Sequence, residues 1–295
     1  MIYLNGEWMP IEQARVPVLD RGFIFGDGVY EVIPSYSGHP FRLREHLVRL
    51  QSSLDAVRIA NPYSHDRWDE LVREIVARNS WEDQGVYLQV TRGVAPRDHA
   101  FPEGVTPTVF MMANPLVTPP QSQRDQGVAA VTVADNRWLR CDIKSVSLLA
   151  NCLLRQAAVD ADAVEAVLLR DGMLTEGSAS NIFLVRKGVV ITPPKTNFIL
   201  PGITYDVVIE LARANRVPLE IRQVSEAEVR SADELWLTSS TKEVLPISTL
   251  DGKPVGHGEK AGRPGPLAAR MNQLYQDYKR TVMRAPADVQ ESAAK

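Results

Sequence analysis

The chain has 295 residues, of which 44% are hydrophobic and 23% charged, the composition of an ordinary soluble globular protein. At roughly 150 residues per domain, this length predicts two domains. A net charge of −3 creates no broad positive field, so we expect no nucleic-acid or membrane partner. No apolar run approaches the ~18 residues of a membrane span, and the N-terminus lacks the pattern of a secretory signal. Cys141 and Cys152 are too few for a disulfide scaffold. The sequence therefore predicts a cytoplasmic protein, and it predicts no metal site.

The first half of the chain alternates short strands with amphipathic helices. A strand is predicted over 29–36, bounded by Gly28 and a Gly-His-Pro turn. Leucines at helical spacing over 43–57 and apolar residues over 68–76 predict two helices, and strands are expected at 85–91 and 108–112. A polar stretch rich in Pro and Gln follows. These features predict a small N-terminal α/β domain at residues 1–117 and an interdomain linker at 118–127.

The second half is richer in strands. Strands are predicted over 128–134, 164–169, 181–185, 189–192, 219–222 and 234–238, and helices over 148–160, after Pro201-Gly202, and over 267–280. Gly and Pro residues predict a surface loop at 252–266. We expect a large C-terminal domain at residues 128–284 and a disordered tail at 285–295, so the whole chain is of the α/β class.

Lys144 is the first candidate for chemistry. Every basic residue before it, apart from histidine, is an arginine. Arginine does not lose its proton in proteins, whereas a lysine among apolar neighbours can do so and then react with an aldehyde. A lysine that only extends from the edge of an element to solvent is the alternative.

Two further segments contain candidate binding groups. Glu176 lies in a run of small residues before an apolar strand, where a flat ring could approach the backbone and meet a carboxylate. Ile203 and Thr204 open a helix after Pro201-Gly202, and the free N–H groups of a helix N-terminus form an anion site. An ordinary polar turn and a helix end without a ligand remain the alternatives.

In their order and spacing, these and other segments resemble the fold-type IV pyridoxal-phosphate aminotransferases, and among them most closely the D-amino acid aminotransferases. The resemblance covers residues 1 to about 280. It is carried by Asp20 to Val32, Glu45 to Leu50, Gln89 to Gly93 with Arg97 to His99, the Lys144 segment, Thr175 to Phe183 and Thr238 to Glu243. It implies a smaller N-terminal α/β domain and a larger C-terminal domain with a mixed-sheet pseudo-barrel. Ala179 departs from a pattern that has serine at this position, which removes one hydroxyl near the cofactor.

The resemblance also implies roles for individual residues. Lys144 would hold pyridoxal 5'-phosphate through a Schiff base and then move the proton between the substrate Cα and the cofactor. Glu176 would bind the pyridine nitrogen. The cofactor phosphate would be bound by Arg49, the Ile203 and Thr204 amides and Ser240.

Tyr30, Arg97 and His99 would bind the substrate, the last two reaching its carboxylate from a loop of the partner subunit in a homodimer. From the residues alone, a half-buried strand tyrosine and two solvated loop residues are the favoured interpretations, and the resemblance favours the binding roles. The implied reaction is ping-pong transamination between a D-amino acid such as D-alanine and a 2-oxo acid, either 2-oxoglutarate or pyruvate. A branched-chain L-amino acid aminotransferase, an (R)-amine transaminase, an aminodeoxychorismate lyase and a non-catalytic pyridoxal-phosphate-binding protein remain alternatives.

Overall fold

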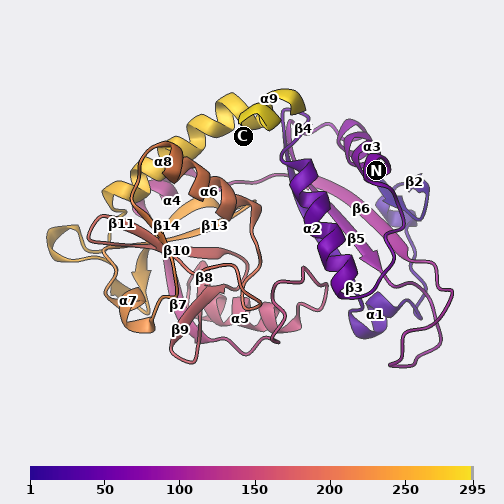
Figure 1. The fold of residues 1–295 in the computed structure, drawn as a ribbon, viewed down its shortest axis with the longest axis horizontal. Helices are drawn as coiled ribbons and strands as arrows, with labels where there is room; N and C mark the ends of the chain where they lie inside the picture. The colour runs from indigo at the N-terminus through magenta and orange to yellow at the C-terminus, as the bar shows by residue number, and fades with distance from the viewer. Residues whose placement is uncertain (294–295) are drawn as a thin grey trace. The chain divides into compact units, whose positions relative to one another are not determined.

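The structure is a computed structural model that describes residues 1–293, and Figure 1 shows its helices and strands. The chain forms two compact units. The first contains Met1–Leu116, Ile143–Leu148 and the C-terminal segment from Lys279, and the second contains Val117–Asp142 and Leu149–Tyr278. The first unit therefore includes two segments that the sequence analysis assigns to the large domain or to the tail. Composition does not signal this exchange, since it depends on contacts between residues distant in sequence.

The first unit is built on a six-stranded antiparallel sheet with the strand order β2-β1-β6-β5-β3-β4. The strands are β1 (Ile2–Leu4), β2 (Glu7–Met9), β3 (Gly28–Tyr36), β4 (His39–Pro40), β5 (Asp83–Thr91) and β6 (Thr108–Pro115). The helices are η1 (Ile11–Gln13), α1 (Arg21–Phe25), α2 (Leu43–Ala56), α3 (His65–Ala77), η3 (Lys279–Met283) and α9 (Ala287–Ala293).

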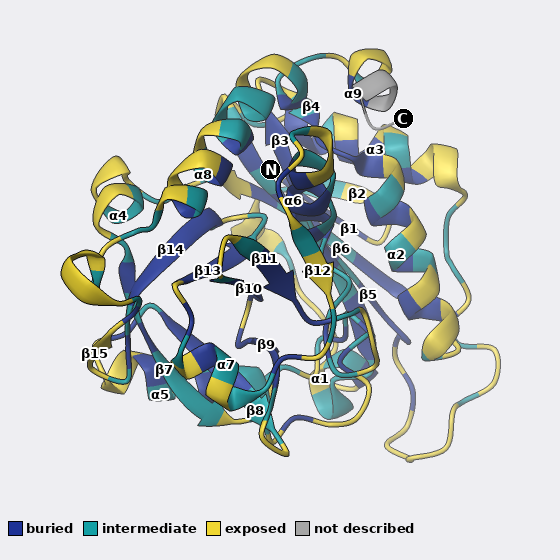
Figure 2. Cartoon of the chain, turned by 60° about the vertical axis from the view of Figure 1, so that its left-hand side comes forward, coloured by how far each residue is buried: buried dark blue, intermediate teal, exposed yellow. Residues whose placement is uncertain are grey.

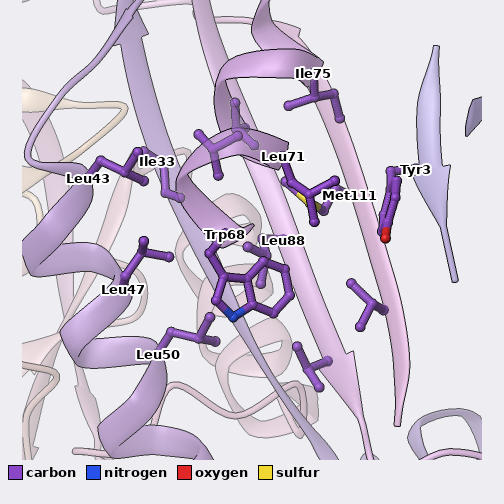
Figure 3. Close-up of a cluster of buried hydrophobic side chains, with 14 of the residues drawn as sticks. Tyr3, Ile33, Leu43, Leu47, Leu50, Trp68, Leu71, Ile75, Leu88 and Met111 are labelled. Atoms are coloured by element: carbon purple, nitrogen blue, oxygen red, sulfur yellow. The ribbon is translucent and has the colours of Figure 1, made fainter. Parts of the chain in front are cut away.

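The core of this unit lies between the sheet and helices α2 and α3. Leu43, Leu47 and Leu50 of α2 point toward the buried side chains of the strands, and Trp68 of α3 fills the space beside them (Figure 3). Ser64 caps α3 by accepting a hydrogen bond from the Arg67 N–H. The structure thus confirms both helices that the spacing of the apolar residues predicts.

The C-terminal segment of this unit is bound to the sheet. The Arg284 guanidinium contacts Asp83 at 2.6 Å and Glu82 at 2.9 Å. The buried side chain of Gln290 accepts a hydrogen bond from the Arg42 N–H and donates one to the Ala285 carbonyl. Helix α9 therefore lies in the segment 285–295, where the sequence analysis expects a disordered tail. Residues 294 and 295 of that expectation lie outside the described residues.

The second unit has a nine-stranded mixed sheet that curls, as Figure 2 shows from a view in which its buried strands are dark blue. The strand order is β12-β11-β10-β13-β14-β7-β8-β9, with β15 paired to β14. The pairs β7–β8, β7–β14 and β11–β12 are parallel and the others are antiparallel. The strands are β7 (Val128–Ala134), β8 (Glu165–Arg170), β9 (Met173–Gly177), β10 (Asn181–Arg186), β11 (Val189–Thr192), β12 (Leu219–Ile221), β13 (Glu234–Ser239), β14 (Glu243–Leu250) and β15 (Lys253–Pro254).

Helices α5, α6 and α8 pack against this sheet. The helices of the unit are α4 (Gln121–Gln126), α5 (Leu149–Asp160), α6 (Ile203–Ala214), α7 (Glu226–Arg230), η2 (Gly258–Lys260) and α8 (Pro266–Tyr278). Helix α4 lies in the expected linker, and β15 and η2 lie in the expected loop 252–266. No helix within residues 1–293 has the length and apolar character that crossing a membrane requires. The α/β class and the mixed sheet of the larger unit are confirmed.

Candidate active site

Lys144 lies in the short segment 143–148, which runs beside strand β3 in the first unit. The Tyr30 N–H donates to the Lys144 carbonyl at 2.9 Å, and the Val146 N–H donates to the Gly28 carbonyl at 3.0 Å. The Lys144 Nζ lies 4.1 Å from the centre of the Tyr30 ring. Both backbone bonds hold this segment to a strand of the core, so the position of the half-buried lysine side chain is well defined.

A buried ion-pair network lies on the same strand. The side chains of Val29, Glu31 and Ile33 alternate into the core, so Glu31 is a carboxylate at an apolar position. It accepts two hydrogen bonds from Arg49 of α2, at 2.8 and 2.7 Å, and lies 2.8 Å from the Nδ1 of His46 on the same helix. A two-point contact of this kind fixes the plane of the Arg49 guanidinium.

The protonation states of this network follow from its geometry. Burial alone would raise the pKa of Glu31, but Arg49 and His46 outweigh it and lower the pKa to about 2. Burial lowers the pKa of His46, and the positive charges of Arg49 and Lys144 act in the same direction. At neutral pH we therefore expect an ionised Glu31, a neutral His46 that donates through Nδ1, and a cationic Arg49.

Arg97 and His99 lie on the loop between β5 and β6, and both are exposed. The Arg97 guanidinium lies 5.3 Å from the centre of the Phe25 ring, and the His99 ring lies 5.4 Å from the same centre. Phe25 is the last residue of α1. The structure thus brings these two candidate residues together at one aromatic side chain.

In the second unit, Glu176 lies near the end of strand β9 and is buried. Its Oε1 accepts a hydrogen bond from Arg137 at 2.5 Å, and its Oε2 accepts from the Leu200 N–H at 3.0 Å and from the Asn181 side chain at 3.2 Å. Arg137 is itself held by a two-point contact with Asp135. The carboxylate of Glu176 is therefore fixed by three donors from separate segments.

The pKa of Glu176 is raised to about 7 because burial disfavours the charged form more strongly than Arg137 and the Leu200 N–H favour it. The ordinary value is 4.5. Between pH 4.5 and about 7 the folded chain consequently binds more protons at this site than the unfolded chain does. The stability that this group contributes is fully present below pH 4.5 and is lost as the pH rises through about 7.

A Glu176→Gln variant tests this direction of the pH dependence of stability, since glutamine does not titrate. We expect the free energy of unfolding of the ligand-free parent to fall, relative to that of the variant, between pH 5 and pH 8. Urea denaturation at several pH values measures it, and one titrating group allows a slope of at most about 1.4 kcal/mol per pH unit. The exposed Glu103→Gln variant is the control. Parallel pH profiles for the parent and Glu176→Gln would contradict the assignment.

Two more candidate binding groups lie near Glu176 along the chain and across the sheet. Leu200, whose N–H binds Glu176, is followed by Pro201 and by Gly202, the N-cap of α6. Within the described structure this N-cap has no side-chain hydrogen bond, so the first N–H groups of the helix, those of Ile203 and Thr204, are not capped by it. Ser240 follows strand β13, on which Thr238 pairs with Asn181 of β10.

A buried carboxylate organises the turn that follows Glu176. Glu165 of β8 accepts hydrogen bonds from the Ser178 N–H and hydroxyl and from the Ser180 hydroxyl at 2.7 Å. It also pairs with Lys242 at 3.1 Å. Glu165 therefore connects the turn after Glu176 with the segment after Ser240. Within the described residues, no group of three or more His, Cys, Asp or Glu side chains is arranged to hold a metal ion.

The sequence-predicted residues thus fall into two groups, one in each unit. Tyr30, Arg49, Arg97, His99 and Lys144 lie in the first unit, and Glu176, Ile203, Thr204 and Ser240 lie in the second. Glu31 and His46, which orient Arg49, and Arg137, which orients Glu176, were not among the predicted site residues. A glutamate at an inward position of an apolar strand, as Glu31 is between Val29 and Ile33, was an available signal.

Comparison with known proteins decides the family. The model of the amino-transferase class IV family matches residues 28–250, which is most of the chain and includes both Lys144 and Glu176. The chain belongs to this family.

Relatives agree with this assignment over nearly the whole chain. A D-alanine aminotransferase from Bacillus licheniformis is 42% identical over 276 residues, covering 94% of this chain and 96% of the relative. A D-alanine aminotransferase from Staphylococcus epidermidis is 38% identical over 277 residues, covering 94% and 97%. Among solved structures, the T.th. branched-chain amino acid aminotransferase with pyridoxamine 5'-phosphate is 27% identical, with a TM-score of 0.87 and coverage of 97% and 95%. The family match and these relatives confirm two predictions. The chain has the fold-type IV architecture, and it is an aminotransferase.

Proposed function

We propose that this class IV aminotransferase uses pyridoxal 5'-phosphate to transfer the amino group of a D-amino acid, such as D-alanine, to a 2-oxo acid, 2-oxoglutarate or pyruvate, by a ping-pong mechanism. The observation that carries the choice of D-amino acid is the pair Arg97 and His99, two groups suited to a carboxylate that meet at Phe25. The 42% identity to a relative named D-alanine aminotransferase supports the same choice.

The residues fit the cofactor. An ionised carboxylate offers about four acceptor positions, and the described hydrogen bonds of Glu176 occupy three of them. One position on Oε1 is therefore left for the N–H of a protonated pyridine ring. Arg49, the Ile203 and Thr204 amides and the Ser240 hydroxyl are the donors that a phosphate group requires. When bound, pyridoxal phosphate supplies an electron sink that makes the Cα–H bond of an amino acid acidic and carries the amino group between the two acids.

Lys144 acts as the base in this proposal. Its Nζ would take the proton from the Cα of the donor amino acid and pass it to the bound cofactor, and in the second half of the reaction it would move a proton back to the Cα of the new amino acid. The ring of Tyr30 lies against the same Nζ and limits the directions in which the lysine side chain can move. Arg137 favours the ionised form of Glu176 through its 2.5 Å contact, and so favours a protonated pyridine nitrogen.

In this proposal Arg97, His99 and Tyr30 bind the substrate carboxylate. An arginine fork binds both oxygens of a carboxylate, and the imidazole N–H and the tyrosine hydroxyl add directional donors. In the described structure the side chains of Arg97 and His99 form neither an ion pair nor a hydrogen bond with residues 1–293, so their donors are available to a ligand.

A branched-chain L-amino acid aminotransferase is the second candidate, because the solved structure with a TM-score of 0.87 is named a branched-chain amino acid aminotransferase. The two candidates differ in the side from which the carboxylate is bound, and an L-specific enzyme of this fold does not need the Arg-x-His pair.

Amino transfer to 2-oxoglutarate by the purified enzyme, with D-alanine and L-leucine as donors, separates the two candidates. We expect the value of kcat/KM for D-alanine to exceed that for L-leucine by at least about 100-fold, the discrimination that one well-placed charged contact of a few kcal/mol provides. Turnover of L-leucine alone would keep the family and overturn the proposed substrate. Turnover of neither donor would favour the lyase or the amine transaminase.

The proposal includes a homodimer whose active site takes Arg97 and His99 from the partner subunit. It is supported by two leucines one helical turn apart on α5, Leu149 and Leu153, whose side chains are 75% and 60% exposed, an apolar face suited to a second copy of the chain. Sedimentation at the mass of a single chain with full activity would contradict it. The proposed location is the cytoplasm, which agrees with two cysteines that are both free.

A further inference from the structure

We propose that Phe25 and Arg21 of helix α1 are positioning residues that set the specificity for the substrate carboxylate, because they hold the loop with Arg97 and His99 in its binding geometry. This inference rests on the proposed role of those two loop residues. It assigns a role to two side chains that touch neither the cofactor donors nor Lys144 in the arrangement described above.

Phe25 is the common contact of three charged or polar side chains. The guanidinium carbons of Arg21 and Arg97 lie 4.7 and 5.3 Å from its ring centre, and the His99 ring lies at 5.4 Å with an interplanar angle of 48°. Distances within about 6 Å are those of a cation–π contact. An aromatic side chain attracts a guanidinium without using its N–H donors, whereas a carboxylate partner would occupy them. Phe25 can therefore orient Arg97 and leave its fork free for a substrate.

Arg21 fixes the backbone of the loop at the residue between Arg97 and His99. Its Nη1 donates to the Asp98 carbonyl at 2.5 Å, and its Nε donates to Asp27 at 2.8 Å. The side chain of Arg21 is buried, which shields the guanidinium end of both bonds from solvent. One guanidinium thus holds the loop backbone and the segment that follows α1 at the same time.

A second buried arginine anchors Asp27. Arg92 makes a two-point contact with the Asp27 carboxylate at 2.7 and 2.9 Å and donates to the carbonyls of Val57 and Arg58. Burial alone would raise the pKa of Asp27, but Arg92 and Arg21 lower it. The Arg92 guanidinium also lies 3.7 Å from the centre of the Phe101 ring, two residues after His99. The loop is therefore held between its two binding residues, at Asp98, and just after them, at Phe101.

Helix α1 is a rigid base for this arrangement. Asp20 caps the helix by accepting from the Gly22 N–H, and its second oxygen accepts from the hydroxyls of Thr91 and Thr108 on β5 and β6. A Cβ at Gly22 would overlap the Thr91 methyl carbon, so the helix is in close contact with the sheet. The chain of contacts from the sheet through α1 to the loop is continuous, which a positioning role requires.

The test measures how tightly the cofactor-loaded enzyme binds propionate, a carboxylate of the size of alanine that has no amino group and cannot react. Titration followed by the cofactor absorbance gives its Kd, and steady-state assays give KM and kcat for D-alanine. We expect Phe25→Leu to raise the Kd for propionate and the KM for D-alanine by about 2- to 30-fold, the range of a lost cation–π contact. The value of kcat should change by less than about twofold, and the thermal midpoint and the unliganded spectrum should match the parent.

Three further variants make the result specific. Phe25→Tyr keeps an aromatic face and should bind propionate within about twofold of the parent. Phe23→Leu makes the same substitution two residues earlier on α1, at a side chain that is 75% exposed, and should leave all constants unchanged. Arg21→Lys keeps the charge but cannot bond Asp27 and the Asp98 carbonyl through one planar group, so we expect it to raise the Kd for propionate in the same way.

An unchanged Kd in both Phe25→Leu and Arg21→Lys overturns the inference, and so does an equal increase in Phe23→Leu or a parent that does not bind propionate. Failure of the proposed function would give a different experimental result. A parent that binds propionate in a Phe25-dependent way but uses L-leucine and not D-alanine leaves this inference in place and removes the D-amino acid assignment.

Discussion

Replacement of Lys144 by alanine is expected to lower the rate of amino transfer from D-alanine by at least about 10³-fold, the upper part of the range for a positioned general base. The reason is that its Nζ is the group we assign to the Cα proton. Arginine at this position should be equally inactive, since it keeps the positive charge but does not release a proton. Single-turnover formation of pyruvate from D-alanine measures the loss.

Two controls separate chemistry from folding in this experiment. Lys187→Ala changes an exposed lysine in the turn between β10 and β11 and should retain the parent rate. The backbone bonds of residue 144 to Ser53 and Tyr30 remain in the alanine variant, which loses the contact of Nζ with the Tyr30 ring, so we expect it to stay folded with a thermal midpoint within about 4 °C of the parent value. A Lys144→Arg variant with a tenth or more of the parent rate would mean that another group moves the proton.

The sequence predicted those parts of the fold that depend on local pattern. Helix α3 has a serine cap and apolar residues at helical spacing, and its core contacts follow directly from both features. The short elements were not predictable in this way. Helix α1 has only five residues, and it is held by Asp20, whose partners Thr91 and Thr108 are distant in sequence.

The C-terminal segment, too, is stabilised by contacts with residues that are distant in sequence. Its polar, alanine-rich composition has no strong helical stripe, yet Arg284 pairs with Glu82 and Asp83, and Gln290 is buried with hydrogen bonds on both sides of its amide. The contacts of Arg284 and the bond from Arg42 reach residues more than 200 positions away, and they stabilise a helix that local propensity alone does not predict.

For the candidate site, the sequence supplied residues with distinctive chemistry and missed those that orient them. Lys144 and Glu176 stand out because lysine is absent before position 144 and because a carboxylate precedes an apolar strand. Arg137 and Arg21 do not stand out, since arginine is the common basic residue of the first half of the chain. Their function depends on which carboxylate or carbonyl each one contacts after folding, which residue spacing does not reveal.

Replacement of Arg97 by alanine is expected to lower kcat/KM for D-alanine by about 30- to 1000-fold. Truncation of one partner of a charged, hydrogen-bonded pair costs about 2–4 kcal/mol, and this factor follows from that cost. Most of the loss should appear in KM, because the α-carboxylate is bound both before and during the reaction. Steady-state kinetics with D-alanine and with 2-oxoglutarate measure it, and both substrates should be affected because both have this carboxylate.

The Arg97→Lys variant separates the contribution of the two-point hydrogen bonding from that of the positive charge. The ammonium group keeps the attraction but loses the two-point geometry, so its kcat/KM should lie between those of the parent and the alanine variant. Arg44→Ala, at an exposed arginine of α2, is the matched control and should leave kcat/KM unchanged. If Arg97→Ala keeps the parent KM for D-alanine, the carboxylate is bound elsewhere. The preference for the D-amino acid would then need another source than the loop between β5 and β6.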